Sequence, residues 1–281
     1  MQLAVRAARA FSRALLPAAE HERLEHLQFH DAGHGWDRLG LRPDAVRASA
    51  AATRFLYEVW FRVDSRGGEQ IPSSGPAILA ANHSGMLPVD GMMLWADVLR
   101  RTEPPRVARV VADRFVPRLP LVYTAFSRNG VVSGNRATLE RLLGDSELLA
   151  VFPEGVPGIA KPPSERYRLQ PFRVGHAELA IRFRAPIVPV AIVGAEEQWP
   201  ELARIESFHL FGAPYLPIPA TPFPLPVRYR IRYGAPIDPR GRFAPEQADD
   251  PTTTRALARE VQSAVQALID EALRERKGIF R

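Results

Sequence analysis

The chain of 281 residues carries a formal net charge of +6, and 46% of its residues are hydrophobic and 24% charged. This composition is that of a globular protein and excludes collagen-like, coiled-coil and broadly disordered classes. The length suits one large α/β domain or two small ones. The sequence has no cysteine, which excludes disulfides, zinc ribbons and thiol nucleophiles. Any nucleophilic catalysis must therefore use oxygen or nitrogen groups.

The positive charge is carried almost entirely by arginine, because only Lys161 and Lys277 among the 37 basic residues are lysines. A guanidinium grips phosphate with two hydrogen bonds, where an ammonium offers a point charge. The excess allows nucleic acid, an anionic membrane surface or a small phosphorylated substrate as a partner. The arginines are spread along the chain rather than gathered in a dense stripe, which argues against nucleic acid.

Residues 1–30 are predicted to form a helix, with Arg6, Arg9 and Arg13 lying largely off its apolar stripe. The pattern is typical of a helix at a membrane interface, or of one that packs on its own domain. The same arginines interrupt any apolar core of a signal peptide. The stripe consists of Leu3, Ala7, Ala10, Phe11, Ala14 and Leu15. A second helix is predicted over 45–60, with Asp44 as its N-cap.

Strands and helices then alternate, which predicts a mostly parallel mixed sheet flanked by helices. Strands are expected at 77–81, 107–112, 147–152, 186–193 and 227–233, and helices at 89–101, 138–143, 173–184 and 252–277. The division is a helical segment over 1–64 and a main domain over 65–281. Two prolines place the strand at 186–193 at an edge or a bulge.

The longest uncharged run, 207–227, contains six prolines, so no helix within it can cross a bilayer. Its aromatic part, 208–223, suits an acyl-chain groove, a dip into the membrane interface or a buried connection.

A histidine and an aspartate stand where an apolar strand gives way to a helix. The strand runs directly into Asn82 and His83, a Gly/Pro turn follows, and Asp90 opens the helix. α/β sheets bind ligands at the carboxyl ends of their strands. A histidine there can act as a general base if an acid fixes its tautomer. A loop histidine that caps a turn, with Asp90 capping the helix, explains the same pattern.

Three further motifs follow. One leads from Gly130 to Arg136 and presents a guanidinium just before a helix, which suits an anionic group. Another delivers Glu154 from a buried strand into a Pro/Gly turn, and Arg166 and Arg173 beyond it are candidates to hold a phosphate or a second substrate. The last is a β-rich run centred on Pro189. The turn reads Phe152-Pro153-Glu154-Gly155.

Taken in this order, the four motifs resemble those of the glycerolipid acyltransferase family, the lysophosphatidic acid acyltransferase-like proteins, over about residues 66–240. The resemblance implies the fold of that family. It also implies that His83 deprotonates the acceptor hydroxyl as this attacks an acyl thioester, and that Asp90 orients and stabilises His83. No covalent intermediate, metal or other cofactor is implied.

The resemblance also assigns the substrate-binding residues. Arg136 would bind the acceptor phosphate, Glu154 with Gly155 would shape the acceptor site, and Pro189 would help form its floor. The rest of the implied set is Asn82, Gly130, Phe152 and Pro153.

The chain departs from the family pattern in two places. Six residues separate His83 from Asp90 where the family has four, and positions seven apart on one helix lie about 10 Å apart along its axis. We therefore expect His83 to lie off the helix, on a turn that folds back toward Asp90. The interior of the Gly130–Arg136 motif lacks the bulky Phe-Ile common in the family.

The resemblance implies transfer of a fatty acyl group from acyl-CoA or acyl carrier protein to a glycerolipid-type hydroxyl in phospholipid biosynthesis. The leading acceptor is 1-acylglycerol-3-phosphate or another lysophospholipid. The expected location is cytoplasmic and peripheral, on the inner face of the cell membrane. No nucleic-acid partner is expected.

Two alternatives stay open. One is a catalytically weak relative that binds lipid or membrane. The other is a metal-dependent hydrolase that uses a histidine cluster between residues 21 and 34, although Gly33 and Gly35 argue against a continuous helix there. The cluster consists of His21, His26, His30 and His34.

Overall fold

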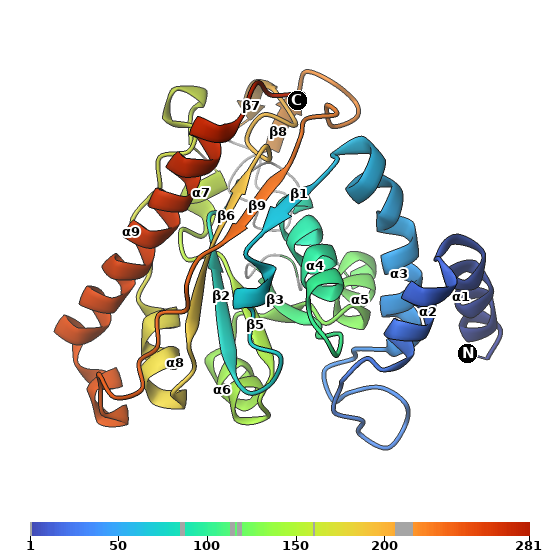
Figure 1. Ribbon diagram of the computed structural model, residues 1–281, viewed down its shortest axis with the longest axis horizontal. Helices are drawn as coiled ribbons and strands as arrows, with labels where there is room; N and C mark the ends of the chain where they lie inside the picture. Colours follow the sequence, from blue (N-terminus) through green and yellow to red (C-terminus); the bar gives the residue numbers. More distant parts are fainter. Residues whose placement is uncertain (1, 85–87, 113–115, 117–119, 160, 206–215) are drawn as a thin grey trace.

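The computed structural model describes the chain except residues 1, 85–87, 113–115, 117–119, 160 and 206–215. A seven-stranded sheet runs through the centre in the order β1-β9-β6-β2-β5-β3-β4 (Figure 1). Five strands are parallel, and β9 pairs antiparallel with β6 and carries β1. The predicted mostly parallel mixed sheet is thus confirmed. Its strands are β1 (Asp64–Arg66), β2 (Ala77–Ala81), β3 (Ala108–Ala112), β4 (Val132–Ser133), β5 (Leu148–Val151), β6 (Ile187–Val193) and β9 (Arg230–Tyr233).

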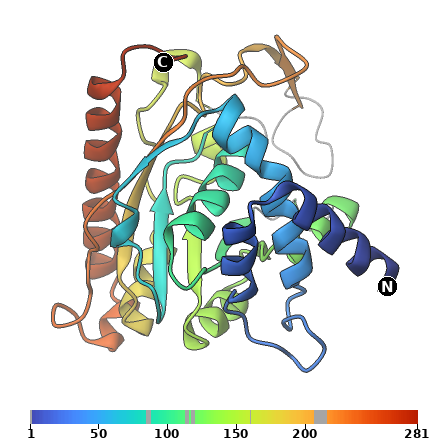
Figure 2. The ribbon, with the colours of Figure 1, turned by 45° about the vertical axis from the view of Figure 1, so that its right-hand side comes forward.

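Helices cover both faces of the sheet (Figures 1 and 2). One face carries α3 (Pro43–Phe55) and α4 (Val89–Arg101), with α1 (Gln2–Leu15) and α2 (Ala18–Glu25) outside them. The other carries α6 (Arg136–Gly144), α8 (Gly175–Phe183) and α9 (Pro251–Glu275). The remaining elements are α5 (Pro120–Arg128), α7 (Val156–Ile159), a π-helical turn η1 (Leu56–Trp60) and the 3₁₀ turns η2 (Gly68–Gln70), η4 (Pro163–Glu165) and η6 (Pro245–Asp249). The strands β7 (Glu201–Ile205) and β8 (Leu216–Pro219) form a separate antiparallel pair.

The strand β2 shows why the sheet needs both layers. Ala77, Leu79 and Ala81 belong to the core under α3 and α4, whereas Ile78 and Ala80 belong to the core under α8 and α9. Successive side chains of a strand point to opposite faces, so a strand that is apolar throughout must be covered twice.

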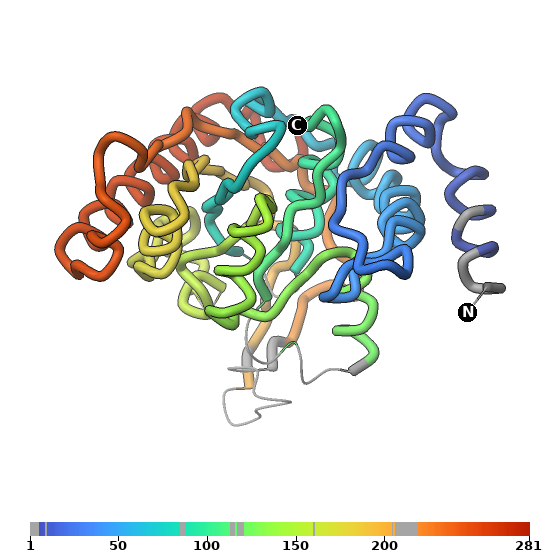
Figure 3. The backbone as a smooth tube through the Cα atoms, turned by 90° about the horizontal axis from the view of Figure 1, so that it is seen from below, coloured from blue at the N-terminus to red at the C-terminus, as the bar shows by residue number. Residues whose placement is uncertain are grey.

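The predicted continuous helix over 1–30 is wrong, because the chain leaves the helical conformation at Leu16 and Pro17. The residue before a proline is disfavoured in the helical region. The helix α1 lies along α3, while residues 2–55 as a whole stay to one side of the sheet (Figure 3). Phe11 nevertheless keeps 45% of its surface exposed.

The prediction that Asp44 caps the second helix is also wrong. That helix opens with Pro43 and is flanked by Arg42, whose guanidinium bonds the Asp44 carboxylate at 3.1 Å. Proline suits this first position because its missing N–H has no partner there anyway.

The strand β6 lies inside the sheet, so the expected edge or bulge at 186–193 is wrong. Its seven residues are all buried between β2 and β9. Pro189 lies just beyond the last residue pair between β6 and β9, and its carbonyl accepts the Gly234 N–H at 2.9 Å. Only the reciprocal bond, which would need a proline N–H, is lost.

Most of the other predicted elements are found, with shifted ends. The helix at 89–101 has the predicted bounds, whereas α5, β4 and the pair β7–β8 were not predicted. The first half of the 208–223 segment, residues 208–215, lies outside the described residues. Within the part of the chain that the structure describes, no helix has the length and apolarity that crossing a bilayer requires.

A buried carboxylate joins α4 to three other elements. Asp97 accepts hydrogen bonds from the Tyr57 hydroxyl, from Ser65 Oγ at 2.7 Å and from the Tyr233 hydroxyl at 2.6 Å. Burial, with Asp97 adding to it, raises the pKa of Tyr57 and that of Tyr233 above the usual tyrosine range. Both phenols therefore stay protonated and act as donors.

We predict that Asp97→Ala lowers the free energy of unfolding by about 2–6 kcal/mol. Two buried phenols each lose an acceptor, at about 1–3 kcal/mol per group. Chemical denaturation followed by circular dichroism measures the change. Asp238→Ala is the control, since its carboxylate pairs only locally with the exposed Arg240. An unfolding midpoint for Asp97→Ala equal to that of the wild type would contradict the prediction.

Candidate active site

The strand β2 ends in two residues that point to opposite sides. Asn82 follows the face of Ala80 and is fully buried, with its amide donating to the Ile192 carbonyl at 3.0 Å and accepting from the Ile192 N–H at 2.7 Å. It therefore ties the end of β2 to β6. Its predicted contact with substrate stays a prediction. His83 follows the face of Ala81, toward α4.

His83 and Asp90 are brought together despite their spacing. His83 Nδ1 lies 2.7 Å from Asp90 Oδ2, and the Asp90 side chain is 0% exposed in the first turn of α4. His83 lies off that helix, as expected; residues 85–87 of the intervening turn lie outside the described residues. The Asp90 carboxylate also accepts the N–H groups of Ser84 at 2.9 Å and Gly91 at 2.7 Å.

These contacts fix the chemistry of the imidazole. The Asp90 carboxylate has an N–H donor on each oxygen, and its place at the start of a helix favours a negative charge. It accepts a proton-bearing Nδ1, which makes Nε2 of His83 the basic nitrogen. The His83 side chain remains 13% exposed. The pair has the arrangement of a general base and the acid that orients it.

The strand β5 lies beside β2 and delivers a second set of groups to the same edge. The Phe152 ring stacks on His83 with centroids 4.5 Å apart. Glu154 Oε1 accepts the His83 N–H at 2.9 Å, and Oε2 accepts the Gln170 N–H at 2.7 Å. Pro153 accepts the Arg173 N–H at 3.0 Å. The Phe152–Gly155 turn thus holds both the backbone and the ring of His83.

A buried lysine balances the charge of Glu154. The Lys161 side chain is 4% exposed, and its Nζ lies 3.5 Å from Glu154 Oε2 and 2.9 Å from Glu196 Oε1. A buried carboxylate needs such a partner, because an unpaired charge in the interior is costly. The sequence motifs did not single out Lys161, although it is one of only two lysines in the chain.

Gly155 turns the chain beside these groups. Its φ of 60° is in the left-handed region, and a Cβ at this position would lie 2.8 Å from Arg173 Cζ. The left-handed conformation is the one that favours glycine at this position.

Arg136 lies apart from the His83–Asp90 pair. It opens α6 after β4, an edge strand three positions from β2, which corresponds to about 14 Å across the sheet. Its guanidinium is 59% exposed, pairs with Glu140 at 2.9 Å and also bonds Glu178. Gly130 ends the turn before β4, and Pro189 lies within β6 opposite Ala80. The predicted substrate-binding roles of these three residues stay predictions.

The histidines between residues 21 and 34 do not share a helical face, because α2 ends at Glu25. His30 Nε2 bonds the Asp145 carbonyl at 2.6 Å, while His34 packs on Trp36. In the described residues, which include all four histidines, no group of three or more histidine and acidic side chains is placed to hold a metal ion.

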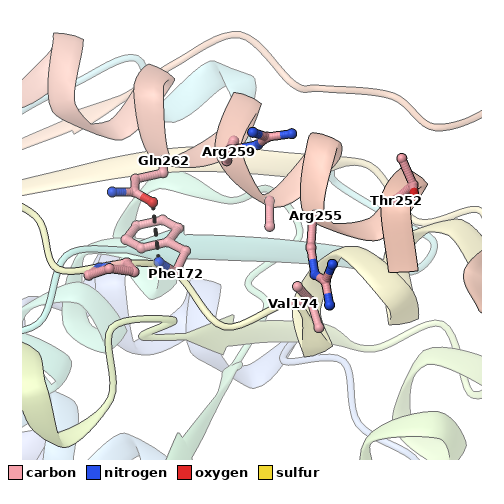
Figure 4. Close-up of a pocket in the computed structure, with 8 residues that line it drawn as sticks. Phe172, Val174, Thr252, Arg255, Arg259 and Gln262 are labelled. Atoms are coloured by element: carbon pink, nitrogen blue, oxygen red, sulfur yellow. Dashed lines mark hydrogen bonds between the residues drawn. The ribbon is translucent and has the colours of Figure 1, made fainter. Parts of the chain in front are cut away.

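The segment 167–176 joins the Phe152–Gly155 turn to α9. Gln262 Oε1 accepts the Phe172 N–H at 3.2 Å (Figure 4). Gln266 Oε1 accepts the Leu169 N–H at 3.1 Å. A cavity of about 370 Å³ lies between this segment and α9. Its lining includes Pro171, Phe172, Val174, Thr252, Arg255 and Arg259.

His176 anchors the end of this segment. Its Nδ1 lies 2.8 Å from the Arg173 carbonyl, while its buried Nε2 has no protein partner among the described residues. Burial lowers the pKa of His176 to about 4, since the charged imidazolium is disfavoured there.

We predict that His176 makes stability pH-dependent between pH 6.5 and 4. The unfolded chain binds the proton first, so stability is complete above pH 6.5 and falls by about 3 kcal/mol as the pH approaches 4. Denaturation at a series of pH values measures this loss. His176→Gln keeps a donor for Arg173 and should remove this component; parallel pH curves for the two proteins would contradict the prediction.

Comparisons with known proteins show which family this chain resembles. The acyltransferase family model matches residues 62–193. The chain is 40% identical over 237 residues to an uncharacterized protein of Mycobacterium tuberculosis, covering 81% of this chain and 66% of that protein. It is 30% identical over 218 residues to the human DGAT1/2-independent enzyme synthesizing storage lipids, covering 76% and 62%. The chain therefore spans just under two thirds of the length of these relatives.

A solved structure shares the fold. The crystal structure of the 1-acyl-sn-glycerophosphate acyltransferase PlsC from Thermotoga maritima aligns with a TM-score of 0.55 and 18% sequence identity. The alignment covers 84% of this chain and 83% of that one.

Proposed function

We propose that the chain is a member of the glycerolipid acyltransferase family and transfers a fatty acyl group from a thioester donor to a glycerolipid-type hydroxyl; the acyltransferase family model over residues 62–193 and the fold shared with PlsC support this. The observation that carries the proposal is the buried Asp90 carboxylate on Nδ1 of His83, at the carboxyl edge of a parallel sheet. The donor is acyl-CoA or acyl carrier protein. The leading acceptor is 1-acylglycerol-3-phosphate or another lysophospholipid, which places the reaction in phospholipid biosynthesis.

In the proposed reaction, Nε2 of His83 takes the proton of the acceptor hydroxyl while its oxygen attacks the thioester carbonyl carbon. The tetrahedral intermediate then collapses, the carbon–sulfur bond breaks, and the imidazolium returns the proton to the thiolate. Asp90 stabilises the imidazolium between the two steps. Glu154 and Phe152 keep His83 in place, and no covalent enzyme intermediate is needed.

Two observations support a second class of acceptor, the neutral glycerolipids. The human and bovine relatives are named as enzymes that synthesise storage lipids. In addition, the guanidinium of Arg136 is already engaged by two glutamates. A neutral glycerolipid acceptor is therefore the alternative to a phosphorylated one, and a lipid-binding protein without turnover is the alternative to an enzyme.

We propose that the protein works as a peripheral protein at the cytoplasmic face of the cell membrane. Support comes from exposed apolar side chains on the packed pair α1 and α3 and on the adjoining η1. These are Phe11, Leu15, Phe55 and Val59. Exposed Arg6 and Arg13 on α1 suit anionic head groups.

We predict that His83→Ala lowers kcat/KM for acyl transfer by about 10²–10⁴-fold, because the general base is lost. The assay incubates labelled acyl-CoA or acyl carrier protein with a panel of lysolipid acceptors and separates the products by lipid chromatography. His34→Ala, an exposed histidine far along the chain from the site, serves as the control. Wild-type transfer by a folded His83→Ala protein would refute the mechanism. Vesicle binding without His83-dependent turnover would favour the lipid-binding alternative.

Asp90→Asn should reduce transfer by a comparable ~10²–10⁴-fold while the protein stays folded. An amide has one acceptor oxygen, and its NH₂ group facing Nδ1 favours the tautomer with a proton on Nε2, which removes the base. Single-turnover kinetics with the best acceptor measures the chemical step. A rate within threefold of the wild type would exclude the proposed role of Asp90.

A further inference from the structure

One arginine outside the His83–Asp90 pair lies directly on the turn that holds His83. The Arg173 N–H donates to the Pro153 carbonyl, and its guanidinium lies against Gly155. A Cβ added at Gly155 would lie 2.8 Å from Cζ of Arg173 and 3.0 Å from each of its Nη atoms. The three distances are nearly equal, so the guanidinium lies face-on against the glycine.

Hydrogen bonds fix the backbone before and after Arg173. Phe172 N–H is bonded by Gln262 of α9, the Arg173 carbonyl by His176, and Gln170 N–H by Glu154. Phe172 and Val174 line the cavity beside α9 (Figure 4). Arg173, between them in the chain, has its guanidinium against Gly155 of the Phe152–Gly155 turn. The guanidinium is therefore presented by an ordered segment.

The charge of Arg173 is not neutralised by the protein. Arg173 is exposed, and in the described part of the chain no carboxylate pairs with it. The nearest acid along the turn, Glu154, is occupied by the N–H groups of His83 and Gln170 and by Lys161. Arg136, by contrast, has two glutamate partners.

A guanidinium with unused donors, held beside a general base, suits an anionic group of a substrate. Phosphate fits best, because its oxygens match the planar fork of arginine. Resting on the acyl transfer proposed above, we propose that Arg173 binds a substrate phosphate at the Phe152–Gly155 turn and thereby determines substrate specificity. That phosphate belongs to the acceptor or to the CoA donor, and the experiment separates the two.

The test compares the wild type with Arg173→Gln, which keeps hydrogen-bonding groups but removes the charge. The acceptors are 1-acylglycerol-3-phosphate and monoacylglycerol, and the donors are acyl-CoA and acyl-dephospho-CoA, which lacks the 3′-phosphate. A charged hydrogen bond of this kind corresponds to a ~10–100-fold increase in KM. An increase confined to the phosphorylated acceptor identifies the acceptor phosphate. An increase confined to acyl-CoA identifies the donor phosphate. Arg173→Lys should recover part of the affinity.

Arg168→Gln is the matched control, because among the described residues this exposed arginine of the same segment makes no side-chain hydrogen bond or ion pair with the turn. It should leave every KM unchanged. Equal losses with all four substrates would mean that Arg173 is structural, and unchanged KM values would overturn the proposal. A KM increase in Arg136→Gln alone would assign the phosphate to Arg136 instead.

Binding measurements test this proposal independently of the proposed catalytic activity. Calorimetry of 1-acylglycerol-3-phosphate and of CoA with His83→Ala, and with His83→Ala carrying Arg173→Gln, needs no turnover. We expect at least tenfold weaker binding of one of the two ligands in the double variant. Equal affinities for both ligands overturn the proposal for Arg173, whereas absence of transfer by the wild type overturns only the proposed activity.

Discussion

The position of His83 at the carboxyl edge of the sheet depends on one buried carboxylate, that of Glu154. Its two oxygens bond the backbone of His83 and of Gln170, and Lys161 balances its charge. The carboxylate thus joins the end of β2, the end of β5 and the segment that leads to α8. Both oxygens must accept, which an amide cannot provide. Within this arrangement Glu154 acts on the protein itself, by holding the residue that carries the proposed base.

The parallel sheet explains why this carboxylate can reach His83 at all. The strands β2 and β5 are neighbours in the same direction, so His83 and the Phe152–Gly155 turn emerge at the same edge although about seventy residues separate them. Asn82 adds the tether to β6 on the other side. Three adjacent strands therefore define the position of a single imidazole, and α4 supplies the Asp90 carboxylate from above.

The arginines of this protein form ion pairs both at the surface and in the interior. Arg136, Arg182 and Arg242 pair with carboxylates at the surface, where such pairs contribute little to stability. Arg109 is buried with Asp37 and Glu147 and fastens the segment before α3 to β3. Among the arginines that the structure describes, Arg173 combines an exposed guanidinium without a carboxylate partner and a contact with the Phe152–Gly155 turn. Apart from Arg173, these arginines from the excess seen in the composition thus either form ion pairs at the surface or hold buried segments together.

The sequence by itself determined the alternation of strands and helices, the ends of α4 and the placement of His83, Asp90 and Glu154 at strand or helix ends. These depend on local periodicity and on turn residues, which a short window of sequence contains. Only the tertiary structure decided what each group touches. In the folded protein, Pro189 lies in an interior strand and Asn82 hydrogen-bonds to Ile192. Arg136 forms ion pairs with two glutamates, and the guanidinium of Arg173 contacts Gly155. These contacts join residues far apart in the chain, so they follow from the order of the strands and the packing of the helices, which no local pattern encodes.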